Sequence, residues 1–188
     1  VPAIVEDYMK KISEITGRNY GLFDYYGDPE ADRVIIAMGS VTEAIRETID
    51  HLTAQGEKVG LVAVHLYRPF SAKHFLAAVP ATAKTIAVLD RTKEPGANGE
   101  PLYLDVKECF YGKENAPVIV GGRYGLGSND TTPAQILAVY ENLALPEPKN
   151  QFTLGIVDDV TFTSLPQKEE VAMGGEGMFE AKFYGLGA

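Results

Sequence analysis

Short apolar runs alternate with longer amphipathic segments along most of the chain. The runs are rich in valine, isoleucine, leucine and alanine, and they lie at residues 34–38, 59–66, 85–89 and 118–120. Uninterrupted apolar runs are typical of strands covered on both faces, as in parallel βαβ units. The segments between and after them predict helices at residues 41–55, 71–79, 102–110 and 133–143. This alternation predicts an α/β fold, a three-layer α/β/α sandwich with a mostly parallel sheet of about five strands.

The N-terminal part of the chain predicts one helix and one short strand. Apolar side chains recur at helical spacing at Ile4, Tyr8, Ile12 and Ile15. They predict a helix over residues 3–16, which Gly17 ends as a C-terminal cap. Leu22 to Tyr25 predicts the strand that follows.

Two of the predicted helices begin at recognisable signals. Ser40 to Glu43 has the S-x-x-E form of a capping box. Thr132 followed by Pro133 places a capping threonine before a proline at the first helical position. These signals predict that Ser40 and Thr132 each cap a helix.

The C-terminal part of the chain predicts a domain boundary. Two strands are expected at Phe152 to Val157 and at Val160 to Thr163, and the polar, glycine-rich stretch over 165–178 predicts a linker. A last strand is expected at 179–184. We therefore expect one domain over residues 1–164, and a linker with the truncated start of a next domain over 165–188.

Composition narrows the classes of function. Of the 188 residues, 45% are hydrophobic, which is enough for a core, and the net charge is −9. An acidic chain with scattered lysines and arginines is a poor candidate for binding nucleic acid or a membrane. The single cysteine, Cys109, cannot build a disulfide framework or an iron–sulfur cluster, and it fits a reducing compartment.

Three polar loops each follow a predicted strand and hold the candidate site residues. The candidates are Arg68 in RPF, Arg91 and Lys93 in DRTKEPGANGEP, and Arg123 and Ser128 in GGRYGLGS. In an open α/β sheet, ligands and partners meet the loops at the carboxyl ends of the strands. We therefore expect the three loops to lie at one edge of the sheet and to form a contact surface.

Each loop has a structural interpretation beside the functional one. Glycine-rich loops cradle phosphate, but GGRYGLGS matches neither the P-loop nor a clean dinucleotide fingerprint, so a structural turn is the alternative. The 91–96 loop fits either docking or plain solvation, and Arg68 fits either a bridge between loops or a buried support. The three histidines show no metal-ligand spacing, and His65 is expected to be a core residue. Asp158 and Asp159 are expected to form a solvated turn.

Longer stretches of the chain resemble a known enzyme family. They are AMGSVTEAIRETIDHL, VGLVAVHLYRPFSAKHFLAAVP, IAVLDRTKEPGANGEPLYLDV, VGGRYGLGS with TTPAQ after it, and GIVDDVTFTSLP. Together they resemble the second core domain of pyruvate:ferredoxin (flavodoxin) oxidoreductase, which is similar to the C-terminal domain of transketolase. The tail FEAKFYGLGA resembles the start of the gamma-type domain that follows.

The resemblance implies a fold and a parent activity. The fold is a three-layer α/β/α sandwich with a mixed five-stranded sheet, in which the strand at 22–25 is the candidate for the antiparallel one. The parent enzyme decarboxylates pyruvate on thiamine diphosphate and magnesium, passes electrons through 4Fe-4S clusters to ferredoxin or flavodoxin, and releases acetyl-CoA from coenzyme A. It is a homodimer of the anaerobic cytoplasm.

This chain lacks the parent family's cofactor machinery. It has neither a GDG…N diphosphate–magnesium motif nor a cysteine cluster, so the resemblance implies no catalytic residue, no metal ligand and no cofactor here. The favoured hypothesis is a non-catalytic segment that supports and joins the other domains. The alternatives are a module that binds coenzyme A or phosphate within that enzyme, and a separate nucleotide-binding enzyme.

Overall fold

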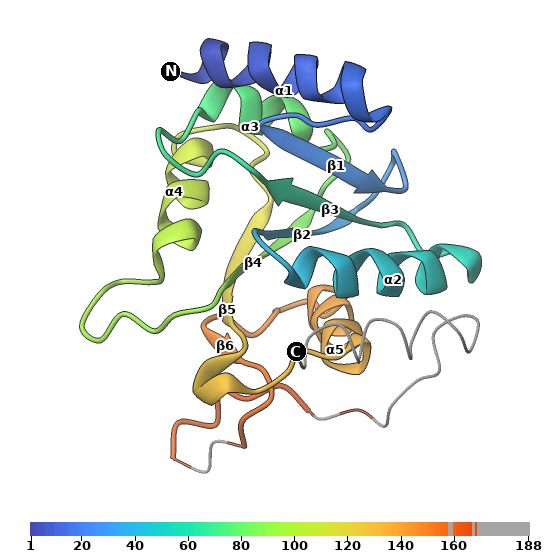
Figure 1. Ribbon diagram of the computed structural model, residues 1–188. Helices are drawn as coiled ribbons and strands as arrows, with labels where there is room; N and C mark the ends of the chain where they lie inside the picture. Colours follow the sequence, from blue (N-terminus) through green and yellow to red (C-terminus); the bar gives the residue numbers. More distant parts are fainter. Residues whose placement is uncertain (158–159, 167, 169–188) are drawn as a thin grey trace.

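A computed structural model describes residues 1–157, 160–166 and 168, and it contains one central six-stranded sheet (Figure 1). The strand order is β1-β3-β2-β4-β5-β6. The strands are β1 (Phe23–Gly27), β2 (Arg33–Ala37), β3 (Val59–Val64), β4 (Thr85–Asp90), β5 (Val118–Arg123) and β6 (Phe152–Thr153). β1 pairs with β3 in antiparallel fashion, and every other pairing in the sheet is parallel.

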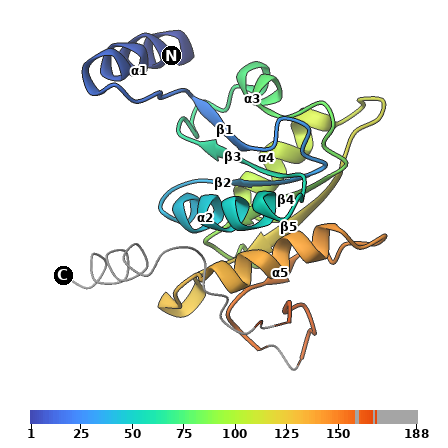
Figure 2. The ribbon, with the colours of Figure 1, turned by 90° about the vertical axis from the view of Figure 1, so that its right-hand side faces the viewer.

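Helices cover both faces of this sheet (Figures 1 and 2). They are α1 (Pro2–Thr16), α2 (Val41–Ala54), α3 (Ala72–Ala78), α4 (Pro101–Phe110) and α5 (Pro133–Leu143), with a short 3₁₀ turn at Leu126–Ser128. One core packs α2 and α5 against the sheet, and the other packs α3 and α4 against the opposite face. The predicted three-layer α/β/α sandwich is confirmed.

Alternation along β2 shows how the strands serve both cores. Ile35 and Ala37 lie in the core under α2 and α5, whereas Val34 and Ile36 lie in the core under α3 and α4. All four are completely buried. Successive side chains of a strand point to opposite faces, so a strand that is covered twice must be apolar throughout. This is the pattern from which the parallel sheet was predicted.

The antiparallel strand lies where the sequence predicted it, and the sheet is one strand larger than expected. β1 begins at Phe23, one residue after the predicted start, and pairs with β3 from Phe23 opposite Val64 to Gly27 opposite Gly60. The sixth strand, β6, is only two residues long and joins β5 through Gly122 and Arg123.

One of the two predicted helix caps is wrong. Thr132 accepts a hydrogen bond from the Gln135 amide at 3.4 Å, as expected of a cap. Ser40 instead has a helical conformation and its side chain makes no capping hydrogen bond. Gly39, at φ 80°, makes the turn before α2, and its carbonyl accepts a hydrogen bond of 2.8 Å from the Thr42 hydroxyl. The chain therefore begins this helix through its backbone turn and not through Ser40.

The segment after α5 differs from the two strands that were predicted. Among the described residues of this segment, Phe152 and Thr153 form a strand, Ser164 makes an isolated bridge to Thr153, and Val160 to Thr163 is not a strand. Phe162 has φ 53°, which an extended strand does not allow. Leu165 returns to the core, where its amide donates to the Thr153 carbonyl at 3.1 Å. Asp158, Asp159 and the strand predicted at 179–184 lie outside the described residues, as does most of the predicted linker.

Candidate functional site

The three polar loops emerge at one edge of the sheet, which we call the carboxyl edge. Arg68 follows β3, the 91–99 loop follows β4, and residues 124–128 follow β5. β3, β4 and β5 run in the same direction because β3 and β4 both pair in parallel with β2, and β5 pairs in parallel with β4. The expectation that the loops share one edge is therefore confirmed.

Asp90 connects β4 to α4 at this edge. It is the last residue of β4 and is 4% exposed. Its two carboxylate oxygens accept the amides of Leu102 at 3.0 Å and Tyr103 at 3.1 Å, which are free N–H groups in the first turn of α4. Burial raises the pKa of Asp90, although the two N–H bonds oppose this effect. Asp90 thus fixes the start of α4 to the end of β4.

Arg123 and Glu100 form a buried ion pair beside it. Arg123 Nε lies 2.6 Å from Glu100 Oε1, and the two side chains are 11% and 2% exposed. Arg123 also donates through Nη1 to the carbonyl of Gln151 at 3.0 Å. The arginine therefore joins the end of β5 to the 91–100 loop and to the residue before β6. The guanidinium group of Arg123, which was a candidate for binding a ligand, thus donates its hydrogen bonds to groups of its own domain.

Arg91 links the two longer loops. Its Nε donates to the carbonyl of Gly125 at 3.4 Å. Gly125 and Gly127 have left-handed conformations, with φ 60° and 65°, and Ser128 has φ 61°. A Cβ atom on Gly125 would lie 2.8 Å from Arg91 Nε, so glycine lets the arginine approach the turn. The result is a compact turn, rich in left-handed residues, with a guanidinium group against it.

Lys93 and Ser128 are exposed, as are Arg68 and Arg91 of the predicted set. Within the described part of the chain, Lys93 makes no ion pair and its ammonium group faces solvent. Ser128 ends the short 3₁₀ turn. A partner or ligand can reach these two side chains and Arg91, together with Arg68, whose guanidinium group is paired with Asp105.

Arg68 is tied to α4. Its Nη1 lies 2.8 Å from Asp105 Oδ2, and its guanidinium group stacks 3.9 Å from the centre of the Tyr67 ring. The side chain remains 55% exposed. Arg68 therefore joins the loop after β3 to α4 at the surface, so the bridging interpretation describes its contacts.

Two residues at this edge were missed by sequence reasoning. Asp90 and Glu100 are buried carboxylates, at 4% and 1% exposed. The available signals were a charged residue that ends an apolar strand and a glutamate before a proline that begins a helix. Neither signal identifies the partners, which are the first turn of α4 for Asp90 and Arg123 for Glu100.

Other candidate residues have ordinary environments. His65 is exposed, contrary to the expectation of a core histidine, because it lies just beyond β3 and contacts Asp24 at 3.1 Å. Burial raises the pKa of Cys109, which makes its thiol less ionised. The described residues contain no group of three or more His, Cys, Asp or Glu side chains that could hold a metal ion. They also contain no helix that is both long and apolar enough to cross a bilayer.

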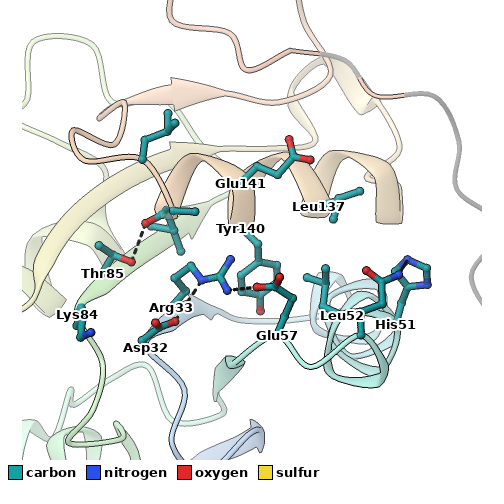
Figure 3. A pocket seen from close by; sticks show the side chains of 14 residues that line it. Asp32, Arg33, His51, Leu52, Glu57, Lys84, Thr85, Leu137, Tyr140 and Glu141 are labelled. Atoms are coloured by element: carbon teal, nitrogen blue, oxygen red, sulfur yellow. Dashed lines mark hydrogen bonds and ion pairs between the residues drawn. The ribbon is translucent and has the colours of Figure 1, made fainter.

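A hollow of about 740 Å³ lies at the opposite edge, where β2 and β4 begin (Figure 3). Arg33 reaches into it between Asp32, at 3.2 Å, and Glu57. Tyr140 lies behind this group and donates its hydroxyl to the Gly60 carbonyl at 2.9 Å. Because Arg33 already pairs with two carboxylates, its guanidinium group is not free to bind an anionic ligand in this hollow. The sequence analysis had not singled out this edge.

Comparison with known proteins decides the family. The family model described as pyruvate:ferredoxin oxidoreductase core domain II matches residues 31–136, which is more than half of the chain. The chain belongs to this family. The match runs from just before β2 into α5, so it includes all three loops of the carboxyl edge.

Curated relatives match along the whole chain. Pyruvate-flavodoxin oxidoreductases from Enterobacter agglomerans and Klebsiella pneumoniae are 57% and 58% identical over 189 residues. Pyruvate:ferredoxin oxidoreductase from Moorella thermoacetica (strain ATCC 39073 / JCM 9320) is 54% identical over 187 residues. Each alignment covers 100% of this chain and 16% of the relative, so the chain spans about one sixth of the length of these proteins.

One solved structure is a more distant match. It is 2-oxoglutarate:ferredoxin oxidoreductase from Magnetococcus marinus, which aligns at 22% sequence identity with a TM-score of 0.47. The alignment covers 75% of this chain and 23% of that chain.

The residues of this chain do not fit the redox and thiamine cofactors that the family resemblance implied. An iron–sulfur cluster is usually held by four cysteine thiolates, and this sequence of 188 residues has one cysteine, Cys109. The magnesium of a diphosphate site needs oxygen ligands gathered at one point. Glu100, Asp105 and Asp90 are instead paired with Arg123, Arg68 and the start of α4.

Proposed function

We propose that this chain is a non-catalytic, inter-domain segment of a pyruvate:ferredoxin (flavodoxin) oxidoreductase. The parent polypeptide oxidatively decarboxylates pyruvate to acetyl-CoA and carbon dioxide and passes the electrons to ferredoxin or flavodoxin. Thiamine diphosphate, magnesium and the 4Fe-4S clusters belong to its other domains, and coenzyme A is its substrate. Support comes from the family match and from the names of relatives that are more than half identical along the whole chain.

The Arg123–Glu100 pair is the observation that carries the scaffold role. A residue that binds a ligand must leave donors free, whereas Arg123 is 11% exposed and directs Nε and Nη1 to groups of its own domain. Arg68 and Arg91 also contact their own domain, at Asp105 and Gly125. The three arginines thus stiffen the carboxyl edge, which suits a surface that holds a fixed shape against another domain.

The partners of this segment are the other domains of the same polypeptide. Arg91, Lys93 and Ser128 are the contacts proposed at the carboxyl edge. Residues 165–188 are proposed as the linker and the start of the next domain, with Leu165 still packed in the core of this one. The parent enzyme is proposed to be a cytoplasmic homodimer that meets ferredoxin or flavodoxin through its other domains.

A second candidate function follows from the turn after β5. Gly125 and Gly127 both adopt left-handed conformations beside Arg91, and turns of this kind can direct backbone N–H groups toward an anion. Lys93 lies in the adjacent loop, is exposed, and makes no ion pair with any residue that the structure describes. This arrangement favours a contact with a phosphate of coenzyme A as the alternative to docking.

The parent activity is tested with the full-length polypeptide. Purified anaerobically, it should reduce ferredoxin or flavodoxin when it is given pyruvate and coenzyme A. It should act on 2-oxoglutarate at least about tenfold less efficiently, a difference of ~1.4 kcal/mol in transition-state binding. Activity with neither acid, or a preference for 2-oxoglutarate, would contradict the assignment.

The docking role is tested by hydrogen exchange. The amides of residues 91–99 and 124–128 should exchange at least about tenfold more slowly in the full-length protein than in the chain of residues 1–188, because a docked domain covers them. The amides of the exposed turn at 111–115, which lies away from this edge, provide the control. Equal exchange rates at the carboxyl edge in the two proteins would show that no domain docks there.

A further inference from the structure

The N-terminal helix α1 carries apolar side chains on a face that its own domain does not cover. We call this set the α1 stripe, and it consists of Val1, which directly precedes the helix, and of Ile4, Tyr8, Ile12 and Ile15. Their exposed fractions range from 48% at Ile12 to 84% at Ile15. α1 contributes no fully buried residue to the domain. Soluble domains seldom leave a continuous apolar strip of this kind in water.

A neighbouring face of the same helix already packs on the domain. Val5 and Met9 are half-buried against the core under α3 and α4. The side chain of Glu6 lies 3.8 Å from His74 of α3, and α1 lies beside α3 in Figure 1. Each residue of an α-helix is rotated by 100° from the one before it. On this geometry the α1 stripe lies directly beside the face formed by Val5 and Met9. The apolar arc of α1 is therefore about twice as wide as its own domain uses, and half of it is left for another surface.

The remaining face of α1 argues against a lipid surface. Its charged residues are Glu6, Asp7, Lys10, Lys11 and Glu14. Acidic side chains outnumber basic ones, whereas helices that lie on anionic membranes have a basic polar face. Lys11 is in addition paired with Asp7 at 2.8 Å. A protein surface is the occupant that this balance of charge fits.

The size of the stripe favours a partner within the same polypeptide. Five such side chains offer roughly 100 Å² each, or on the order of 500 Å² together. Stable association of separate molecules needs about 800 Å² on each side. Domains joined by one chain need less, because the linkage gives them a high effective concentration. The relatives align with α1 included, and 84% of their length lies outside the alignment.

We propose that the α1 stripe is an inter-domain docking surface, covered by an apolar face of another domain of the same full-length polypeptide. This inference extends the proposed scaffold role to a second surface, on α1, outside the residues 31–136 of the family match. It commits to an intramolecular partner, and a second copy of the chain is an outcome of the test.

Photo-crosslinking in the full-length protein tests this assignment. Ile15 and, separately, Ile4 are replaced by the photoreactive residue p-benzoylphenylalanine, and Lys10 on the charged face is replaced in the same way as the matched control. After irradiation, a denaturing gel separates intramolecular from intermolecular products, and mass spectrometry identifies the joined peptides. The expected result is a product with the mass of one chain, joined to residues outside 1–188, at least fivefold more abundant from positions 4 and 15 than from position 10.

Each other outcome overturns the proposal. A product of twice the chain mass would assign the stripe to a second copy. Crosslinks confined to residues 1–188, or equal yields from all three positions, would show that no other domain covers it. The readout does not depend on turnover, so it separates this inference from the proposed function. An enzyme without activity on pyruvate can still give the intramolecular product, and an active enzyme can fail to give it.

A second variant guards against a photoreactive residue that disturbs the contact. I4S/I15S in the full-length protein should raise the exchange rate of the α1 amides at least tenfold, because the covering domain is released. K10S should leave that rate within twofold of wild type. Unchanged exchange in I4S/I15S would contradict the docking surface.

Discussion

Single charged residues decide what the carboxyl edge can do. Arg123 is buried in an ion pair with Glu100, and Asp90 is buried under the start of α4. The charged groups of Arg123 and Asp90 therefore interact with their own domain and not with a ligand. Lys93, two residues beyond Arg91 in sequence, keeps its charge in solvent. The sequence shows the same kind of residue in each of these loops. Only the folded structure distinguishes the buried Arg123 from the accessible Lys93. The partners of Arg123 lie 23 and 28 residues away in the sequence, and Lys93 has no ion-pair partner among the described residues.

Loss of Arg123 should destabilise the domain strongly. R123A leaves the carboxylate of Glu100 buried without its partner, which typically costs about 3–5 kcal/mol. Urea unfolding of the chain of residues 1–188 should show this loss. K93A, from the same edge, should stay within about 0.5 kcal/mol of wild type. A loss below about 1 kcal/mol in R123A would mean that the pair does not support the fold.

Asp90 should make stability fall as the pH rises through the acid range. Burial raises the pKa of its carboxyl above the ordinary value of about 3.9, with further repulsion from Glu100 and Asp105. The folded state therefore binds this proton more tightly than the unfolded chain, so its stabilising effect is complete below about pH 4 and is lost as the pH rises through the folded pKa. The free energy of unfolding of wild type minus that of D90N should decrease between pH 4 and 7. A difference that grows with pH would contradict the burial argument.

At the scale of elements, local sequence predicts the strands and helices better than their ends. The uniform apolar runs identify β2 to β5 because both faces of the sheet are covered, and this requirement acts on every residue of each strand. The strand predicted over residues 152–157 is paired with β5 only at Phe152 and Thr153, so the local pattern predicts β6 but not its short length. The described chain after β6 also departs from its local pattern, because Phe162 has a positive φ where a strand was predicted.

The two predicted caps offer a matched pair of substitutions. T132A removes a side chain that accepts the Gln135 amide, and it should cost about 1 kcal/mol of stability. S40A removes a side chain that makes no capping bond, and it should cost less than about 0.5 kcal/mol. Thermal or urea unfolding of both variants measures the difference. Equal losses would show that Ser40 caps α2 after all.

At the scale of the whole molecule, the chain spans about one sixth of the length of its relatives, and its proposed role is that of a rigid inter-domain segment. The three-layer fold and the shared edge of the loops follow from alternating apolar runs and from the parallel rule, so the sequence alone predicts them. The roles of individual loop residues depend on contacts between distant segments, and the role of the α1 stripe depends on surfaces beyond the chain. Those are the features that needed a structure.

The most direct test of the scaffold role is the KM for coenzyme A of the full-length enzyme. The triple variant R91A/K93A/S128A removes three exposed polar side chains of the carboxyl edge and leaves the buried Arg123–Glu100 pair intact. If the edge serves docking, the KM for coenzyme A should stay within about twofold of wild type, whatever happens to kcat. A rise of at least about tenfold in this KM, or ~1.4 kcal/mol, with an unchanged melting temperature would show that the edge binds coenzyme A and would contradict the account.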